Sequence, residues 1–348
     1  MRNLLLSFTL LVFSCVTFES KQEEEDNPSP ISQNKTELDF REFIGMDYFM
    51  DEQHSYLGFK IKYFGFSPVR GRFENFNGTL FYNPEHIEAT SVSVFVDVGS
   101  IDTGQDRRDE DLKREDTWFN ATTFPIISFQ SSEVILYEDA NFDLIGDLRV
   151  KGITRTDTIS FSAPTAISRD WAENEQVDFS GKFTIDRQEF EVFGGDFWSS
   201  IMENGLTQLS DEVEIELDIH CRRADYTARF NSEDSTSALV HVLRDVKEAN
   251  RLLLEDPSSD EKLNSWTMTA IGRTLNEWGE HEKALISFGK KLEAYPEKHS
   301  TYNDIGVTYL HLGDNLAAKM QFEKSLQSDS TDSRAHEYLR LIRRMVND

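Results

Sequence analysis

The chain has 348 residues and a formal net charge of −27. A chain of this length accommodates two ordinary domains. A surface this negative repels phosphate, so the composition argues against a nucleic-acid-binding protein and favours cationic or neutral partners. The two cysteines, Cys15 and Cys221, can form one bridge at most. Because Cys15 has another expected fate, we predict no structural disulfide.

The first fifteen residues have the composition of a targeting segment. Arg2 is followed by an apolar run over residues 4–13 that is too short to span a bilayer. Ser14 before Cys15 resembles the cleavage site of a bacterial lipoprotein, which would make Cys15 the lipid-modified first residue of the mature protein. The alternative is an ordinary secretory signal. The lipoprotein reading predicts a lipid-anchored protein of the bacterial cell envelope, periplasmic or surface-exposed. Residues 16–39 are acidic and poor in apolar side chains, which predicts a disordered tether.

From residue 40 to residue 222 apolar and polar residues alternate in short stretches separated by turns. This period of two is typical of antiparallel strands with one buried face. The expected strands are 57–63, 71–82, 91–98, 126–136, 142–150, 158–163, 177–185 and 213–219, and the one expected helix covers 106–117. About eight such strands indicate a closed barrel or a sandwich. A barrel of this size either fills itself with side chains or holds one small ligand.

Short motifs spread over about 170 residues resemble those of the YceI-like family, a lipocalin-like group associated with polyisoprenoid lipids. They occur in the family's order at residues 54–55 (HS), 69–73 (VRGRF), 100–104 (SIDTG), 107–109 (RRD), 124–129 (FPIISF), 151–154 (KGIT) and 186–187 (DR). Tyr63 stands where the family often has histidine, and Trp118 where it has phenylalanine. The resemblance implies an antiparallel eight-stranded lipocalin-like barrel over residues 40–222, with an elongated apolar tunnel. It also implies pairing of two barrels into a homodimer.

Strand parity selects the side chains that face the inside of such a barrel. The expected ligand-binding residues are Phe59, Ile61, Phe73, Leu80, Phe129, Phe142, Leu144, Phe161, Phe183 and Ile185. Each of them is also compatible with a sealed core, and we expect about half to touch a ligand if one is bound. A polyisoprenoid chain in the tunnel needs no catalytic group and no cofactor, because burial of its apolar surface supplies the binding energy.

Three features that suggest other chemistry have simpler interpretations. Residues 102–104 (DTG) match the aspartic-protease tripeptide, but no second copy follows, so we expect a turn with Asp102 bonding backbone amides and Gly104 at positive φ. His54, His86 and His220 lack metal-ligand spacing. The segment 190–198 is either a flap over the barrel mouth or a hydrophobic plug. We therefore predict no catalytic residues, no metal and no enzyme activity.

After residue 223 the apolar period changes to that of helices. Residues 238–254 are predicted to form an amphipathic helix. Gly272, Gly279, Ala284, Phe288 and Leu292 then recur 34 residues later as Gly306, Gly313, Ala318, Phe322 and Leu326. This spacing is typical of tetratricopeptide repeats, here over 266–299 and 300–333, with a capping helix over 332–345. Such a helical domain over residues 223–348 either binds a protein or peptide or packs on the barrel as an appendage.

Two functions follow from the sequence. The first is a membrane-anchored lipoprotein that binds a polyisoprenoid or similar long apolar lipid in the barrel, with the helical repeats recruiting an unknown protein partner. The alternative is an adaptor in which the barrel is structural and the repeats carry the function.

Overall fold

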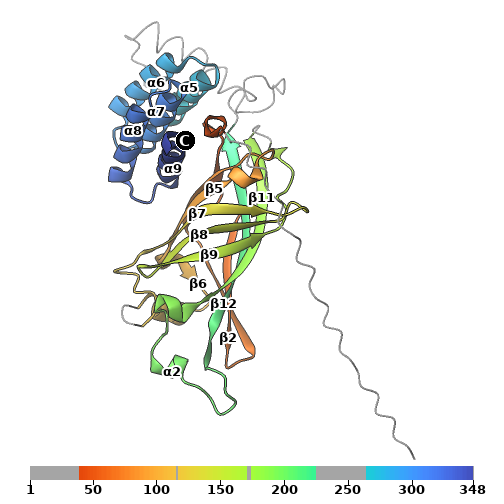
Figure 1. Cartoon of the computed structure of the whole chain (residues 1–348). Helices are drawn as coiled ribbons and strands as arrows, with labels where there is room; N and C mark the ends of the chain where they lie inside the picture. The colour runs from red at the N-terminus through yellow and green to blue at the C-terminus, as the bar shows by residue number, and fades with distance from the viewer. Residues whose placement is uncertain (1–38, 115–116, 171–173, 225–263, 348) are drawn as a thin grey trace, which may run out of the picture.

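The computed structural model describes residues 39–114, 117–170, 174–224 and 264–347. These residues form a β-rich domain with a helical domain at one of its ends (Figure 1). The β-rich domain contains η1 (Phe40–Phe43), β1 (Asp47–Met50), β2 (Tyr56–Tyr63), β3 (Ser67–Phe73), β4 (Phe76–Phe81), η2 (Ile87–Ala89), β5 (Ser91–Asp97), η3 (Val98–Ser100), β6 (Ile101–Asp102), α1 (Asp106–Lys113), β7 (Ile126–Leu136), β8 (Phe142–Val150), β9 (Ile153–Phe161), β10 (Ser168–Arg169), β11 (Asn174–Asp186), η4 (Arg187–Phe190), α2 (Asp196–Ser199) and β12 (Leu209–Ala224). The helical domain contains α5 (Ser265–Glu277), α6 (His281–Ala294), α7 (Ser300–His311), α8 (Asn315–Ser328) and α9 (Ser333–Asn347).

Within the described residues, eight strands close into an antiparallel barrel. Their order is β11-β9-β8-β7-β5-β4-β1-β12, and β12 closes the ring by pairing with β11. Strands β2, β3 and β6 continue from the other edge of β12, toward the end of the barrel that lies away from the helices (Figure 1). The prediction of a closed eight-stranded barrel is therefore confirmed, and a two-sheet sandwich does not form.

Strands β9, β11 and β12 are longer than the stretches predicted over 158–163, 177–185 and 213–219, and two differences affect the strand count. Strand β1 completes the ring between β4 and β12, yet it is only four residues long and too short to show an alternation. The stretch expected as one strand over 71–82 is two strands, β3 and β4, because the chain turns at Glu74 and Asn75. Strand β2 is not one of the eight strands of the ring, but it pairs with β12 on the edge that β1 also uses, and its inward side chains line the barrel interior.

The described helices after residue 264 form two antiparallel pairs, α5–α6 and α7–α8, followed by α9. At Gly272 an added Cβ would lie 2.3 Å from Cε1 of Phe288, and at Gly306 it would lie 2.6 Å from Cζ of Phe322. The 34-residue offset thus reflects one packing contact used twice, in which a glycine lets an aromatic ring reach the partner helix. The tetratricopeptide assignment stays a prediction. The helix expected over 238–254 lies outside the described residues, as does Cys15.

Helix α9 packs on the outer surface of the barrel against β4 and β5. Phe43 and Phe81 of the barrel share a buried cluster with Tyr338 and Ile342 of α9. The Tyr338 ring meets Phe81 edge-on with ring centroids 4.9 Å apart. Of the two arrangements that the sequence left open for the helices, α9 therefore shows the one that packs on the barrel.

Buried polar groups fix the position of α9. Glu337 is fully buried and accepts hydrogen bonds from the hydroxyls of Ser91 and Ser93 on β5. Ser333 bonds Thr79 of β4 at 2.8 Å between the hydroxyl oxygens. Buried polar groups must be paired to be tolerated. The pairing therefore specifies one docking position rather than a sliding apolar contact.

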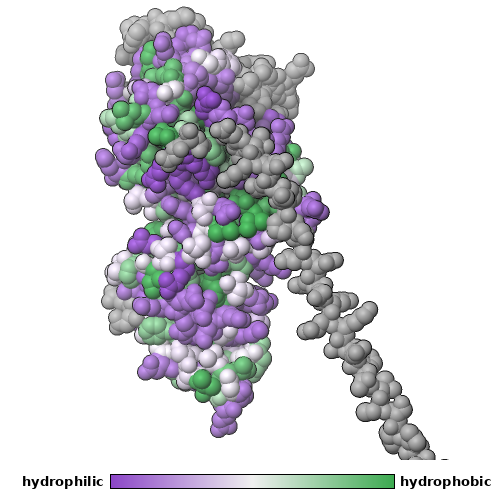
Figure 2. Space-filling model, in the orientation of Figure 1, coloured by the Kyte–Doolittle hydropathy of each residue, from purple (hydrophilic) through white to green (hydrophobic). Residues whose placement is uncertain are grey.

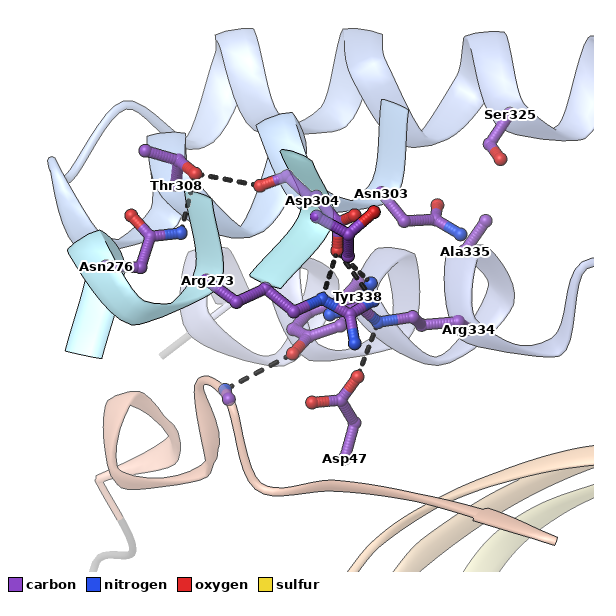
Figure 3. Close-up of polar contacts among 12 residues, drawn as sticks. Asp47, Arg273, Asn276, Asn303, Asp304, Thr308, Ser325, Arg334, Ala335 and Tyr338 are labelled. Carbon is purple, nitrogen blue, oxygen red and sulfur yellow. Dashed lines mark hydrogen bonds and ion pairs between the residues drawn. The ribbon is translucent and has the colours of Figure 1, made fainter. Parts of the chain in front are cut away.

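Arg334 links the two domains through a pair of buried carboxylates. Figure 3 shows its guanidinium between Asp47 of β1 and Asp304 of α7, with Arg273 on the same carboxylate of Asp304. Burial acts to raise the pKa of Asp304, and Arg273 and Arg334 outweigh it, so that this pKa lies below its ordinary value.

Within the described residues, no helix has the length and apolar character needed to cross a membrane.

Candidate ligand-binding cavity

The barrel encloses a cavity of about 720 Å³. Its wall is formed by inward side chains of β2, β3, β4, β5, β7, β8, β9, β11 and β12. The structure places all ten of the predicted ligand-binding residues on this wall: Phe59, Ile61, Phe73, Leu80, Phe129, Phe142, Leu144, Phe161, Phe183 and Ile185. Ligand contact by these residues stays a prediction. Their common location follows from strand parity, because alternate residues of a strand face the same side.

The cavity wall is almost entirely apolar and rich in aromatic rings. Phe142 and Phe161 are stacked on neighbouring strands with centroids 5.2 Å apart, and Phe179 meets Phe142 edge-on at 6.4 Å. Thr90, Cys221 and Arg187 are the buried polar side chains on the wall. The other polar side chains that line the cavity belong to residues 103–111, near the start of α1. Burial raises the pKa of the Cys221 thiol, so it is protonated at neutral pH. Such a wall suits a chain without charge.

The hydroxyl of Thr90 is the one polar wall atom in the described structure that is both buried and unpaired: Oγ1 has no hydrogen-bond partner there. An unpaired buried hydroxyl is costly unless water or a ligand satisfies it. Thr90 could therefore bond an oxygen of a bound molecule. No sequence pattern pointed to this residue, because it lies in the connection before β5 rather than in an alternating strand.

A β-bulge shapes the wall between β7 and β8. The register shifts between Ser131 and Glu133. Opposite the bulge, a Cβ added to Gly146 would lie 2.4 Å from the carbonyl oxygen of Gln130 and 2.6 Å from Cζ of Phe129. Only glycine fits so close to a neighbouring backbone. Gly146 therefore maintains the wall, and a larger residue there would break the sheet rather than fill the cavity.

The cavity opens between the end of β2 and the start of α1. Of the described residues that line it, Tyr63, Gln105 and Arg107 are the exposed ones, and all three lie in this region. Trp118 and Trp198 line the same end, with ring centroids 6.4 Å apart. The mouth is thus polar and aromatic, whereas the interior is apolar.

The DTG tripeptide builds one edge of this mouth. The backbone N–H of Gly104 donates to Oδ1 of Asp102 at 2.8 Å, and Gly104 has φ +73°. This is the expected turn. Asp109 of α1 accepts the backbone N–H of Thr103 at 3.0 Å, and Arg108 donates to the Thr103 carbonyl at 2.7 Å. These contacts tie α1 to the turn and leave Arg107 free to face the opening.

A family model described as the YceI-like domain matches residues 48–221, half of the chain. The chain belongs to the YceI-like family. A UPF0312 protein of Vibrio vulnificus (strain YJ016) is 30% identical over 148 residues, which cover 42% of this chain and 77% of the relative. A UPF0312 protein of Pseudomonas aeruginosa (strain LESB58) is 29% identical over 178 residues, which cover 51% of this chain and 86% of the relative.

Two solved structures are similar to the YceI-like domain. BcnA of Burkholderia cenocepacia is 23% identical, with a TM-score of 0.42, over 49% of this chain and 98% of BcnA. A polyisoprenoid binding domain from Saccharophagus degradans is 15% identical, with a TM-score of 0.36, over 51% of this chain and 98% of that domain.

The segment after the Asp-Arg motif closes the YceI-like barrel near β12. Phe190 and Val192 are buried and line the cavity. Arg187 is buried as well, also lines the cavity, and donates to the carbonyl oxygens of Leu209 and Val192 at 3.2 and 2.9 Å. Burial lowers the pKa of Arg187. Of the two possibilities left open for residues 190–198, the first part of the segment is therefore a plug held by Arg187.

The histidines of the YceI-like domain have local partners. His54 bonds Asp51 at 2.8 Å and His220 bonds Asp178 at 2.7 Å, both through Nδ1. Their rings lie 5.9 Å apart, on the outside of the barrel rather than in the cavity wall. Among the described residues, no group of three His, Cys, Asp or Glu side chains is arranged to hold a metal ion.

Proposed function

We propose that the YceI-like barrel binds a polyisoprenoid or a similarly long apolar lipid in its cavity. The observation that carries this proposal is an aromatic and aliphatic cavity of about 720 Å³. A barrel of eight strands can be filled entirely by its own side chains, and this barrel is not. At about 30 Å³ for each water-sized group, this space holds about 24 such groups, roughly four or five isoprene units. Burial of about 400 Å² of such a chain contributes on the order of 10 kcal/mol before entropy costs.

The mouth supports the same proposal. A lipid with its apolar chain in the barrel would leave its head group near Tyr63, Gln105 and Arg107, which are exposed to solvent. A charged head group could not enter the apolar interior without a large desolvation cost. The Saccharophagus degradans domain, whose structure is similar to this barrel, is itself a polyisoprenoid binding domain.

Mass spectrometry of the protein purified from its native membranes, with organic extraction, tests the proposal. Leu144→Trp adds a ring inside the cavity, and Ile145→Trp adds the same ring at the next position of β8, which is absent from the cavity wall. We expect extracted lipid from the unmodified protein and from Ile145→Trp, and much less from Leu144→Trp. A barrel without lipid in the native preparation, or equal lipid in both variants, would refute the proposal.

Membrane attachment is a second part of the proposal and is supported by the Ser14-Cys15 sequence. A lipid on Cys15 would hold the protein at the bacterial envelope, because several acyl chains anchor firmly where one does not. Fractionation of cells that carry Cys15→Ser measures this directly. We expect the variant to move from the membrane fraction to the soluble fraction, and retention at the membrane would contradict the lipoprotein assignment.

A protein partner for the helical domain is a further candidate function. The observation that favours it is a row of exposed apolar side chains on and beside α8: Leu312, Leu316 and Met320. Leu316 and Met320 are four residues apart on α8, which places them on one face of that helix, and Leu312 precedes them in the connection from α7. Chemical cross-linking in the native envelope tests this. The double variant Leu316→Ser with Met320→Ser should abolish a specific cross-link that Leu144→Trp leaves intact.

A further inference from the structure

The end of the barrel away from the helical domain carries exposed apolar side chains. In Figure 1 the turn between β2 and β3 and the segment around α2 project from this end, opposite α5–α9. The exposed fractions are 82% for Phe66, 74% for Ile201, 57% for Phe197 and 48% for Leu206. Figure 2 shows apolar surface at the same end. We call these four residues the apolar tip.

Backbone hydrogen bonds hold the apolar tip in place. The N–H of Phe64 donates to the carbonyl of Gln208 at 2.7 Å, which joins the β2–β3 turn to the segment before β12. The N–H of Met202 donates to the carbonyl of Leu206 at 2.8 Å, and Ile201 takes part in a β-bridge within the same segment. The exposed side chains are therefore displayed on a folded surface.

The apolar tip is continuous with the cavity mouth. Phe197 packs edge-on against Trp198, with ring centroids 4.9 Å apart, and Trp198 lies 6.0 Å from Tyr63. Trp198 and Tyr63 both line the cavity. A path of aromatic side chains thus runs from the outermost residues of the tip to the inside of the barrel.

We propose that the apolar tip docks on the surface of a phospholipid bilayer, so that the cavity mouth faces the membrane. The benefit of docking rests on the proposed function. A long apolar lipid that moved between membrane and barrel through water would expose its whole chain to water, and a mouth docked on the membrane avoids that exposure. Trp and Tyr are the side chains enriched at membrane–water interfaces, because one end of each is apolar and the other polar. Trp198 and Tyr63 lie between the apolar tip and the cavity mouth, where a docked membrane surface would meet them.

The charges around the tip identify a zwitterionic bilayer as the surface that fits. Lys62 and Arg70 are exposed on the same β2–β3 hairpin and can contact lipid phosphates. Asp196 and Glu203 lie in the other half of the tip region and, with the net charge of −27, oppose binding to a strongly anionic surface. A second copy of the chain fits less well, because a stable protein interface needs about 800 Å² from each partner. Four projecting side chains supply only part of that area.

Vesicle co-sedimentation tests the proposal. The chain without residues 1–15, which removes the expected lipid anchor, is mixed with vesicles of phosphatidylcholine. We expect binding, and at least a tenfold weaker partition for Phe66→Ser with Ile201→Ser, since each removes a large apolar side chain from the contact. Leu316→Ser on α8 is the matched control, because Leu316 is 72% exposed but lies on the helical domain. Its binding should equal that of the parent chain.

Three results would overturn the docking proposal. They are no binding by the parent chain, equal binding by the double variant, and a dimer in sedimentation that Phe66→Ser dissociates, which would make the tip an interface between copies. Lipid extraction from the same samples separates this proposal from the proposed function. If the barrel contains lipid but the protein does not bind vesicles, the docking proposal is refuted and the lipid-binding proposal stands. If vesicle binding depends on the tip but the barrel contains no lipid, the docking proposal stands and the lipid-binding proposal is refuted.

Discussion

Replacement of Arg334 by methionine tests how the two domains are held together. Arg334 donates to Asp304 at 2.6 Å and to Asp47, and all three side chains are buried. The variant keeps most of the apolar stem but removes the charge. It therefore leaves Asp47 of β1 and Asp304 of α7 buried with less compensation.

The expected loss is large because an unpaired buried charge is expensive. Removal of one partner from a buried ion pair typically costs about 3–5 kcal/mol. Arg273 still contacts Asp304 at 2.8 Å, so we expect a value near the lower end, about 3 kcal/mol.

Urea unfolding followed by circular dichroism measures this loss. With an m-value of about 2 kcal/mol/M, the midpoint of the helical signal should fall by roughly 1.5 M. Lys319→Met is the matched control, because Lys319 forms a surface pair with Glu323 at 3.7 Å on α8, and such pairs contribute little. A change below about 1 kcal/mol for Arg334→Met, or an equal change in the control, would refute the structural role of Arg334.

Three further predictions follow from single side chains. Desolvation and the neighbouring, stacked His281 lower the pKa of His311 from 6.5 to about 4, so the unfolded chain binds a proton that the folded chain does not as the pH falls from 6.5 to 4. Because part of His311 is exposed to solvent, which screens the shift, we expect a stability loss of only about 1 kcal/mol in that window, and His311→Phe should remove this part of the pH dependence measured by urea unfolding. Gly272→Ala should lower stability against heat by about 1–3 kcal/mol, because the added Cβ meets the ring of Phe288 on α6. Gly289→Ala, which has open space around its Cβ, should cause no such loss, and equal losses would contradict the packing role of Gly272. In a Cys15→Ser background, the buried Cys221 thiol should resist a thiol reagent at pH 8 until urea is added, and rapid reaction of the native protein would contradict its burial.

Docking of α9 changes what the helical domain can do. A smaller second cavity is lined by Phe49 and Asn77 of the barrel and by Arg273 and Asn303 of the helices. The barrel therefore occupies the side of the helical domain that carries these polar residues. Any protein partner would have to use another face, such as the one that displays Leu316 on α8.

The sequence alone determined the direction of the side chains. Because alternation has a period of two, it separated the inner from the outer face of each strand, and all ten predicted residues reached one cavity wall. The 34-residue offset likewise located two helix pairs, since the glycine at position 272 and its counterpart at 306 each receive a ring. These features depend on local periodicity and spacing, which a sequence contains.

Only the tertiary structure decided the rest. Whether the inward side chains fill the barrel depends on how the ring closes, and the four residues of β1, which show no pattern, complete that closure. Thr90 acquired its place at the cavity through a connection between strands. The burial of Glu337 and Arg334 depends on partners more than 240 residues away, Ser93 and Asp47. Such contacts arise from long-range packing, and no local pattern encodes them.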